Sequence, residues 1–325
     1  MADYKTIHGI NIRDYTTDPD TLITGQVWYD TTNKVLQFQA TGAGAWSTTN
    51  NLNTARDQIA GAGTTTSGLV FGENFGGETE SFNGTSYTEQ NDLNNNRRAL
   101  AGAGASNTAA LAFGGNEIHS GPNAAADNTE SFNGTSWTEL ADLNQARSFT
   151  VGCGTNTAAL ALGGSTGNGG NPPITAENES WNGSSWTELG DLNGARNAMG
   201  LGGTTTSAIA FGGGPRTENT ETWNGSTWTE VNNLNTARLA LGGAGSSSTA
   251  AVAFGGSASP GAVGATELWS GSSWAEQNDL SNARTYLASS KGSNTAALAM
   301  GGGSSTNVES FTGAGANSPV DFTVS

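Results

Sequence analysis

Short apolar runs alternate with polar turns along most of this chain, and the pattern repeats six times. One unit reads as an apolar run ending in Gly-Gly at 109–115, a second run at 129–134, a Trp-containing run at 136–139 and a polar phrase at 143–147. The other units carry these phrases in the same order. Short runs bounded by Gly and Asn predict β-strands.

The last phrase of each unit ends in an arginine that sets the period of the repeat. Successive arginines are 41, 50, 49, 42 and 46 residues apart. They are Arg56, Arg97, Arg147, Arg196, Arg238 and Arg284. A period of about 40 to 50 residues built from short β phrases is typical of propeller blades.

Each unit predicts a four-stranded antiparallel meander. The Gly-rich run after the arginine suits an inner strand, because only small side chains fit where blades crowd around an axis. Asn-Gly joins the third and fourth strands at 83–84, 133–134, 182–183 and 224–225. We expect type I′ turns there, with positive φ at both central residues.

The two ends of the repeat predict how the ring closes. The last unit lacks its Trp-containing phrase, and a matching phrase with Trp46 stands alone before Arg56. A ring without open edges needs this strand in its last blade. The expected fold is therefore all-β: a six-bladed propeller at 34–313, whose last blade is closed by an N-terminal strand.

The units resemble the kelch repeat. The resemblance rests on the double glycine, an aromatic residue several positions later and a tryptophan on the last strand. These tryptophans are Trp46, Trp137, Trp186, Trp228 and Trp274, with Tyr87 in the remaining unit. The resemblance implies a kelch-like β-propeller, a fold that serves in binding modules, oxidases and structural parts.

Composition argues against several functions. The chain has 48 Gly, 12% charged residues and a net charge of −16, which disfavours nucleic-acid binding. It has no apolar stretch of membrane-span length and no signal-peptide pattern, so we expect no membrane insertion. His8 and His119 are the only histidines and Cys153 the only cysteine, whereas kelch oxidases hold copper with Tyr and His ligands and a Tyr-Cys crosslink. We expect no enzyme activity, cofactor or metal.

The repeated arginines allow two interpretations. They could form a ring that captures an anion, or each could pair with a nearby carboxylate and with strand-end carbonyls. A glutamate recurs in every unit, at Glu80, Glu130, Glu179, Glu221, Glu267 and Glu309. A position filled identically in every unit favours the scaffold role.

The segment between the second and third strands varies most, from 9 to 17 residues between anchor positions. Such insertions map to one face, often the binding face. The long segments at 116–128 and 165–178 belong to adjacent units, and the alternative is that they are solvated loops without a ligand. The candidate binding residues are His119, Pro122, Asn123, Pro172 and Pro173.

Residues 1–33 precede the repeat and 314–325 follow it as a tail. Residues 25–36 predict two short strands around a polar turn. Their Gly-x-x-Trp-Tyr-Asp-Thr phrase, with Trp28 and Tyr29, resembles one found in structural proteins of tailed bacteriophages. We interpret 1–33 as an attachment arm.

The resemblance implies a non-enzymatic virion structural protein, a tail or tail-fibre component or a capsid decoration, assembled in the host cytoplasm and multimeric in the particle. Its arm would contact other virion proteins, and its loop face a host-surface glycan or protein. The alternative is a non-viral kelch-type module that binds a protein or glycan.

Overall fold

The computed structural model describes residues 6–7, 10–11, 13–15, 27–32, 34–40, 43–73, 76–117, 124–167, 173–313 and 318–321. In these residues the chain forms β-strands and no helix, and antiparallel four-stranded sheets predominate, as in a β-propeller. Two compact units are present. Unit 1 is Met1–Gly44 with Gly313–Ser325, and unit 2 is Ala45–Thr312.

Five sheets of unit 2 each come from one continuous stretch of chain, and we call them contiguous sheets 1 to 5. Their strands are antiparallel and follow chain order, which confirms the predicted meander. The strands are β7(Ala60–Gly63), β8(Gly68–Phe71), β9(Thr79–Phe82) and β10(Tyr87–Glu89) in sheet 1; β12(Ala101–Ser106), β13(Ala109–Phe113), β16(Thr129–Phe132) and β17(Trp137–Glu139) in sheet 2; β18(Val151–Gly154), β19(Ala159–Ser165), β20(Ile174–Trp181) and β21(Trp186–Glu188) in sheet 3; β22(Gly200–Gly203), β23(Ala208–Phe211), β24(Thr220–Trp223) and β25(Trp228–Val231) in sheet 4; and β26(Gly242–Ser247), β27(Ala250–Phe254), β28(Thr266–Trp269) and β29(Trp274–Glu276) in sheet 5.

The remaining four-stranded sheet of unit 2 combines two distant stretches of chain, and we call it the composite sheet. Its order is β30(Ala288–Ser289), β31(Ala296–Met300), β32(Val308–Thr312) and β6(Ala45–Thr48). Trp46 lies opposite Phe311 in the β6–β32 register, so the N-terminal phrase occupies the position of the missing outer strand.

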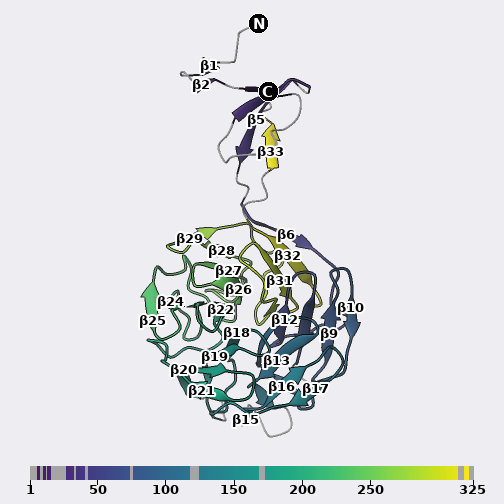
Figure 1. Cartoon of the computed structure of the whole chain (residues 1–325), viewed down its shortest axis with the longest axis vertical. Helices are drawn as coiled ribbons and strands as arrows, with labels where there is room; N and C mark the ends of the chain where they lie inside the picture. Colours follow the sequence, from purple (N-terminus) through teal and green to yellow (C-terminus); the bar gives the residue numbers. More distant parts are fainter. Residues whose placement is uncertain are drawn as a thin grey trace. The chain divides into compact units, whose positions relative to one another are not determined.

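The sheets are arranged around a common centre (Figure 1). First strands contact the first strands of neighbouring sheets in the order β7, β12, β18, β22, β26, β30 and again β7. Glycine allows this close approach. A Cβ on Gly152 would lie 2.4 Å from the ring of Phe113 and 2.8 Å from the Gly102 carbonyl oxygen, both in the neighbouring sheet.

The Asn-Gly turns differ from the expected type I′. The glycine has positive φ, 93° at Gly84 and 95° at Gly134, but neither asparagine is among the described positive-φ residues. The Asn83 side chain instead accepts hydrogen bonds from the Thr85 and Ser86 amides, and the Asn83 N–H donates to the Ser86 carbonyl. The central pair is therefore Gly-Thr, with glycine first as in a type II′ turn, and the prediction of positive φ at both Asn and Gly is wrong.

In four of the six sheets of unit 2, the tryptophan on the outer strand donates a hydrogen bond to the sheet before it. The Trp137 ring packs edge-on against Phe71 of contiguous sheet 1, with centroids 4.9 Å apart, and its Nε1 donates to the Thr79 hydroxyl at 3.0 Å. The same bond recurs from Trp186, Trp274 and Trp46 to threonines of the preceding sheet. Aromatic packing and a buried hydrogen bond thus stabilise the same interface.

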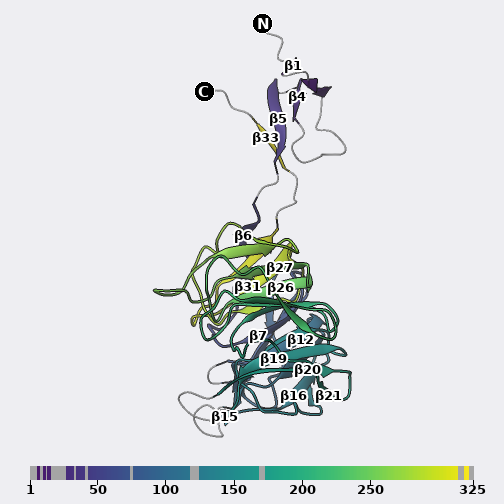
Figure 2. The ribbon, with the colours of Figure 1, turned by 90° about the vertical axis from the view of Figure 1, so that its left-hand side faces the viewer.

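Unit 1 contains a four-stranded sheet in the order β3(Arg13–Tyr15), β4(Val27–Asp30), β5(Val35–Ala40) and β33(Ser318–Asp321), and a separate pair of β1(Thr6–Ile7) and β2(Ile10–Asn11). The antiparallel pairing of β4 with β5 confirms the two strands expected around a polar turn. The other edge of β5 pairs with β33 from the opposite end of the chain (Figure 2). Unit 1 therefore includes residues 34–44, which the repeat pattern assigns to the propeller.

Candidate functional site

The six repeated arginines lie in buried sites of one design. Each Arg precedes the first strand of a sheet, and its Nη2 reaches the recurring glutamate on the third strand of that sheet. The Nη2 to Oε1 distance is 2.7 Å for Arg97 and Glu130, and 2.6 Å for Arg196 and Glu221. The remaining pairs are Arg56 with Glu80, Arg147 with Glu179, Arg238 with Glu267 and Arg284 with Glu309. The expected pairing with a carboxylate is present in every unit.

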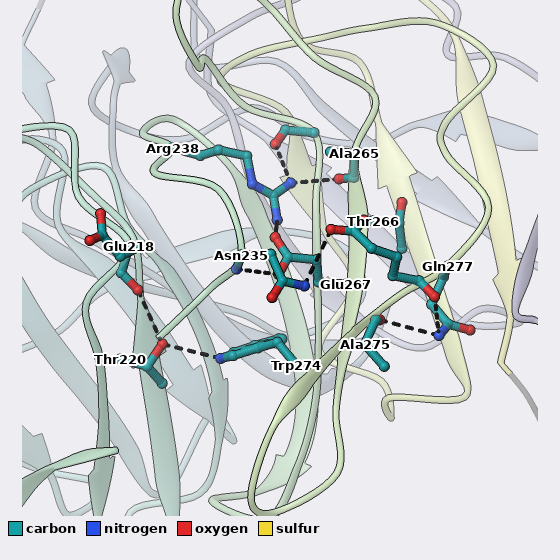
Figure 3. Close-up of polar contacts among 12 residues, drawn as sticks. Glu218, Thr220, Asn235, Arg238, Ala265, Thr266, Glu267, Trp274, Ala275 and Gln277 are labelled. Carbon is teal, nitrogen blue, oxygen red and sulfur yellow. Dashed lines mark hydrogen bonds and ion pairs between the residues drawn. The ribbon is translucent and has the colours of Figure 1, made fainter. Parts of the chain in front are cut away.

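Backbone groups fill the rest of each site, as Figure 3 shows for Arg238. Its Nη1 donates to the carbonyl oxygens of Gly255, at 3.0 Å, and Ala265, at 2.5 Å. The second carboxylate oxygen of Glu267 accepts the Asn235 amide at 2.7 Å. Each arginine thus ties the connection between two sheets to strand ends of the second sheet.

These sites hold no accessible charge. The arginine residues are between 0 and 4% exposed, and each faces a carboxylate. Burial lowers the pKa of the guanidinium groups of Arg97, Arg147, Arg196, Arg238 and Arg284, and the facing glutamate opposes that shift. Because each guanidinium is buried and already paired with a carboxylate, a solute cannot reach it, and this geometry favours the scaffold interpretation over an anion ring.

The first long loop lies partly outside the described residues, which exclude His119, Pro122 and Asn123. Its two ends are anchored: β14(Asn116–Glu117) pairs with β11(Arg97–Arg98) and with β15(Ala124–Ala125). Asn116 is buried in this small sheet.

The second long loop extends a hairpin. Strands β19 and β20 continue their pairing to Ser165 and Ile174. Pro172 lies outside the described residues, whereas Pro173 is exposed and its carbonyl accepts the Thr166 amide at 2.8 Å. Of the five candidate binding residues, the structure therefore places only Pro173.

The two candidate attachment residues differ in exposure. Trp28 is fully buried within unit 1, and Tyr29 is half-buried. The side chain of Trp28 is therefore not exposed.

A ring of backbone hydrogen bonds at the centre of unit 2 was not anticipated from the sequence. It consists of Gln58, Ala99, Phe149, Ala198, Ala240 and Tyr286, all with φ between 46° and 55°. Each N–H donates to the carbonyl of the preceding member at 2.7 to 3.1 Å, and the Gln58 N–H returns to the Tyr286 carbonyl. Positive φ in a residue with a Cβ is strained by about 1 kcal/mol or more. The sequence signal was faint, because residue type varies at this position.

An axial cavity of about 80 Å³ lies among the first strands of unit 2 and is lined by residues of all six sheets. The mouth next to it is lined by the six residues of the backbone ring. Phe149 and Tyr286 contact each other there, with ring centroids 5.7 Å apart. The cavity lining carries one charged side chain, Lys291. Sequence reasoning missed this residue, although it replaces a glycine of the repeat.

Within the described part of the chain, no cluster of three or more His, Cys, Asp or Glu residues could hold a metal ion. The same residues include no helix suited to crossing a membrane. No protein-family model matches the sequence, and a search of curated proteins found no match.

Proposed function

We propose that unit 2 is a closed six-bladed kelch-like β-propeller acting as a non-enzymatic structural component of a tailed-bacteriophage virion, attached through unit 1. The propeller would be a rigid part of a tail, a tail fibre or a capsid decoration, present in several copies. Its variable loop edge would contact a host-surface glycan or protein, or a neighbouring subunit.

The observation that carries the closed propeller is the cycle of six backbone hydrogen bonds, supported by the pairing of β6 with β32. A cycle in which every member both donates and accepts has no free end. Together with first strands that contact in cyclic order, it supports a ring without exposed sheet edges.

The repeated chemistry of unit 2 supports a scaffold and not a catalyst. The recurring arginine and the recurring glutamate of each unit are paired with each other and buried. The same pair occurs in all six sheets. A catalytic site needs reactive groups that a substrate can reach, and these pairs are buried.

The virion assignment rests on the Trp-Tyr-Asp-Thr phrase of unit 1 and on its coupling to near-identical Gly- and Thr-rich repeats. Because unit 1 contains chain from both sides of unit 2, two chain segments connect the units, and a pull on unit 1 would load β6 and β32 together. Such a connection suits a particle protein under mechanical load.

Mass spectrometry of purified phage particles tests this function. The tryptic peptide 197–216 lies between Arg196 and Arg216 and contains no internal cleavage site, so it can be quantified against a known tail or capsid protein. We expect it at a fixed stoichiometry in density-purified particles and in no matched fraction from uninfected cells. Its presence in uninfected cells and absence from particles would contradict the proposal.

The second candidate is a non-viral kelch-type module that binds a protein or glycan. The long connections of contiguous sheets 2 and 3 favour it, because variable loops on a rigid scaffold are common binding surfaces. A monomer in solution that saturably binds such a partner, with no association to particles, would support this candidate instead.

A further inference from the structure

We propose that the axial cavity of unit 2 binds a small carboxylate, with the Lys291 ammonium group as its ion partner. This site is independent of the virion assignment, because it depends only on groups inside unit 2.

Lys291 breaks the repeat at a defined register position. In the contiguous sheets the position is a glycine: Gly63, Gly104, Gly154, Gly203 and Gly245. In the composite sheet the Ser290 amide bonds to the Leu298 carbonyl, which places Lys291 next in the same register. The Lys291 N–H donates to the Gly63 carbonyl at 2.8 Å, so its backbone stays tied to the neighbouring sheet while its side chain lines the cavity.

The cavity lining combines polar groups of the first strands with apolar side chains. Ile59, Leu100, Met199, Leu241 and Leu287 line it. A volume of about 80 Å³ exceeds the roughly 10 to 15 Å³ that one water needs, and leaves room for a ligand of a few non-hydrogen atoms. A short carboxylate matches these surroundings, with its methyl or methylene carbon against the apolar side chains.

The amine lacks a counter-ion in the part of the chain that the structure describes, where no carboxylate lies within ion-pair distance of it. Burial lowers the pKa of Lys291 to about 8, with the Cys153 thiol as the titratable neighbour that acts on it. Burial also raises the pKa of that thiol to about 12, so Cys153 is neutral near pH 7. Lys291 is half-buried, and a protonated amine that is partly withdrawn from water without a counter-ion is stabilised by an anion that enters with it.

The ligand class follows from this donor set. One ammonium group balances one negative charge, and a phosphate dianion requires more donors than a single lysine supplies. Phe149 and Tyr286, both half-buried, line the adjoining mouth, whereas Lys291 lies beyond the other end of β30.

The test compares acetate with acetamide, a neutral molecule of nearly the same shape, on the full chain by NMR titration and thermal shift. The variants are Lys291→Met, Lys291→Gly and, as the control for removal of one positive charge, Lys34→Met, which alters an exposed lysine of unit 1. We expect wild type and Lys34→Met to bind acetate at least tenfold more tightly than acetamide. Both Lys291 variants should lose that preference, and in wild type it should weaken from pH 7 to pH 9.5 as the amine deprotonates.

Three results would overturn the proposal. They are equal binding of acetate and acetamide, no acetate binding by wild type at 100-fold excess over the protein in the millimolar range, and unchanged acetate binding in a folded Lys291 variant. Lys291→Gly restores the residue of the other five sheets, so it keeps the test decisive if Lys291→Met fails to fold. Tighter binding of inorganic phosphate than of acetate would reject the ligand class.

Discussion

The contiguous sheets and the composite sheet share one strand arrangement but differ in which parts of the chain supply the strands. In each contiguous sheet four strands come from one stretch of chain, and the first strand carries glycine at the register position that Lys291 takes. In the composite sheet the first strand is only Ala288–Ser289, the last strand is β6, and Lys291 stands at the glycine position. Residues that recur in every unit thus form the scaffold. The composite sheet departs from the repeat, and it contains both the β6–β32 pairing and the Lys291 amine.

The two interfaces of the composite sheet are also unequal. Trp46 donates to Thr266 of contiguous sheet 5, and the same bond occurs at three other interfaces. On the other side Tyr87 packs with Val308, and its buried hydroxyl has no partner in the described residues. This seam and the one at Trp228, whose indole Nε1 also has no partner in the described residues, therefore lack the sheet-to-sheet hydrogen bond.

Removal of β6 should have the largest effect. We expect residues 45–313 to unfold cooperatively, whereas residues 51–313 should be less stable by more than about 4 kcal/mol or aggregate, because Trp46 leaves its contacts with Phe254 and Phe311 and β32 becomes an edge. Urea denaturation and size-exclusion chromatography measure the difference. Equal stability of the two fragments would show that the composite sheet does not need its fourth strand.

Loss of a repeated arginine should be nearly as severe, and similar in both kinds of sheet. Arg196→Ala in contiguous sheet 4 and Arg284→Ala in the composite sheet should each lower the free energy of unfolding by about 3 to 5 kcal/mol, since each leaves a buried carboxylate unpaired. Exposed Arg216→Ala is the control, with an expected change within about 0.5 kcal/mol. A much smaller loss of unfolding free energy for Arg284→Ala than for Arg196→Ala would mean that the Arg284–Glu309 pair contributes little to the stability of unit 2.

The seam at Tyr87 can be given the Trp–Thr pair that four other interfaces carry. Tyr87→Trp with Val308→Thr should form the missing bond and give a coupling energy of about 1 kcal/mol in a double-mutant cycle, with neither single variant gaining stability. Chemical denaturation of all four proteins supplies the cycle. Simple additivity would show that the Trp–Thr bond contributes nothing at this seam.

The smallest effect concerns the backbone ring. Ala99→Gly and Ala240→Gly should raise the melting temperature slightly, a gain of about 0.5 kcal/mol, because glycine accepts their φ values of 51° and 55° without steric strain. Tyr286→Gly in the same ring should show no gain, since it also loses the contact with Phe149. If both Ala99→Gly and Ala240→Gly lowered the stability, the φ values of these two alanines would not be strained.

The sequence predicted the repeating parts of the molecule well and its exceptions poorly. The four-strand order and the Arg–Glu pairs could be predicted because six copies reinforce each signal. The turn type was wrong because the Asn83 side chain bonds to the backbone, which a dipeptide rule does not reveal. The pairing of β5 with β33 could not be predicted, because it joins residues far apart in sequence that carry no repeated phrase. The position of Lys291 at the cavity could not be predicted either, because this residue occurs in one unit only.

Native-state hydrogen exchange of the six ring amides tests the central claim, closure of the ring through the composite sheet, most directly. The Gln58 amide is the informative one, because its bond to the Tyr286 carbonyl joins the first contiguous sheet to the composite sheet. We expect Gln58 to exchange as slowly as Ala99, Ala198 and Ala240, near the rate of global unfolding. Fast exchange at Gln58 with the other ring amides protected would contradict a closed ring.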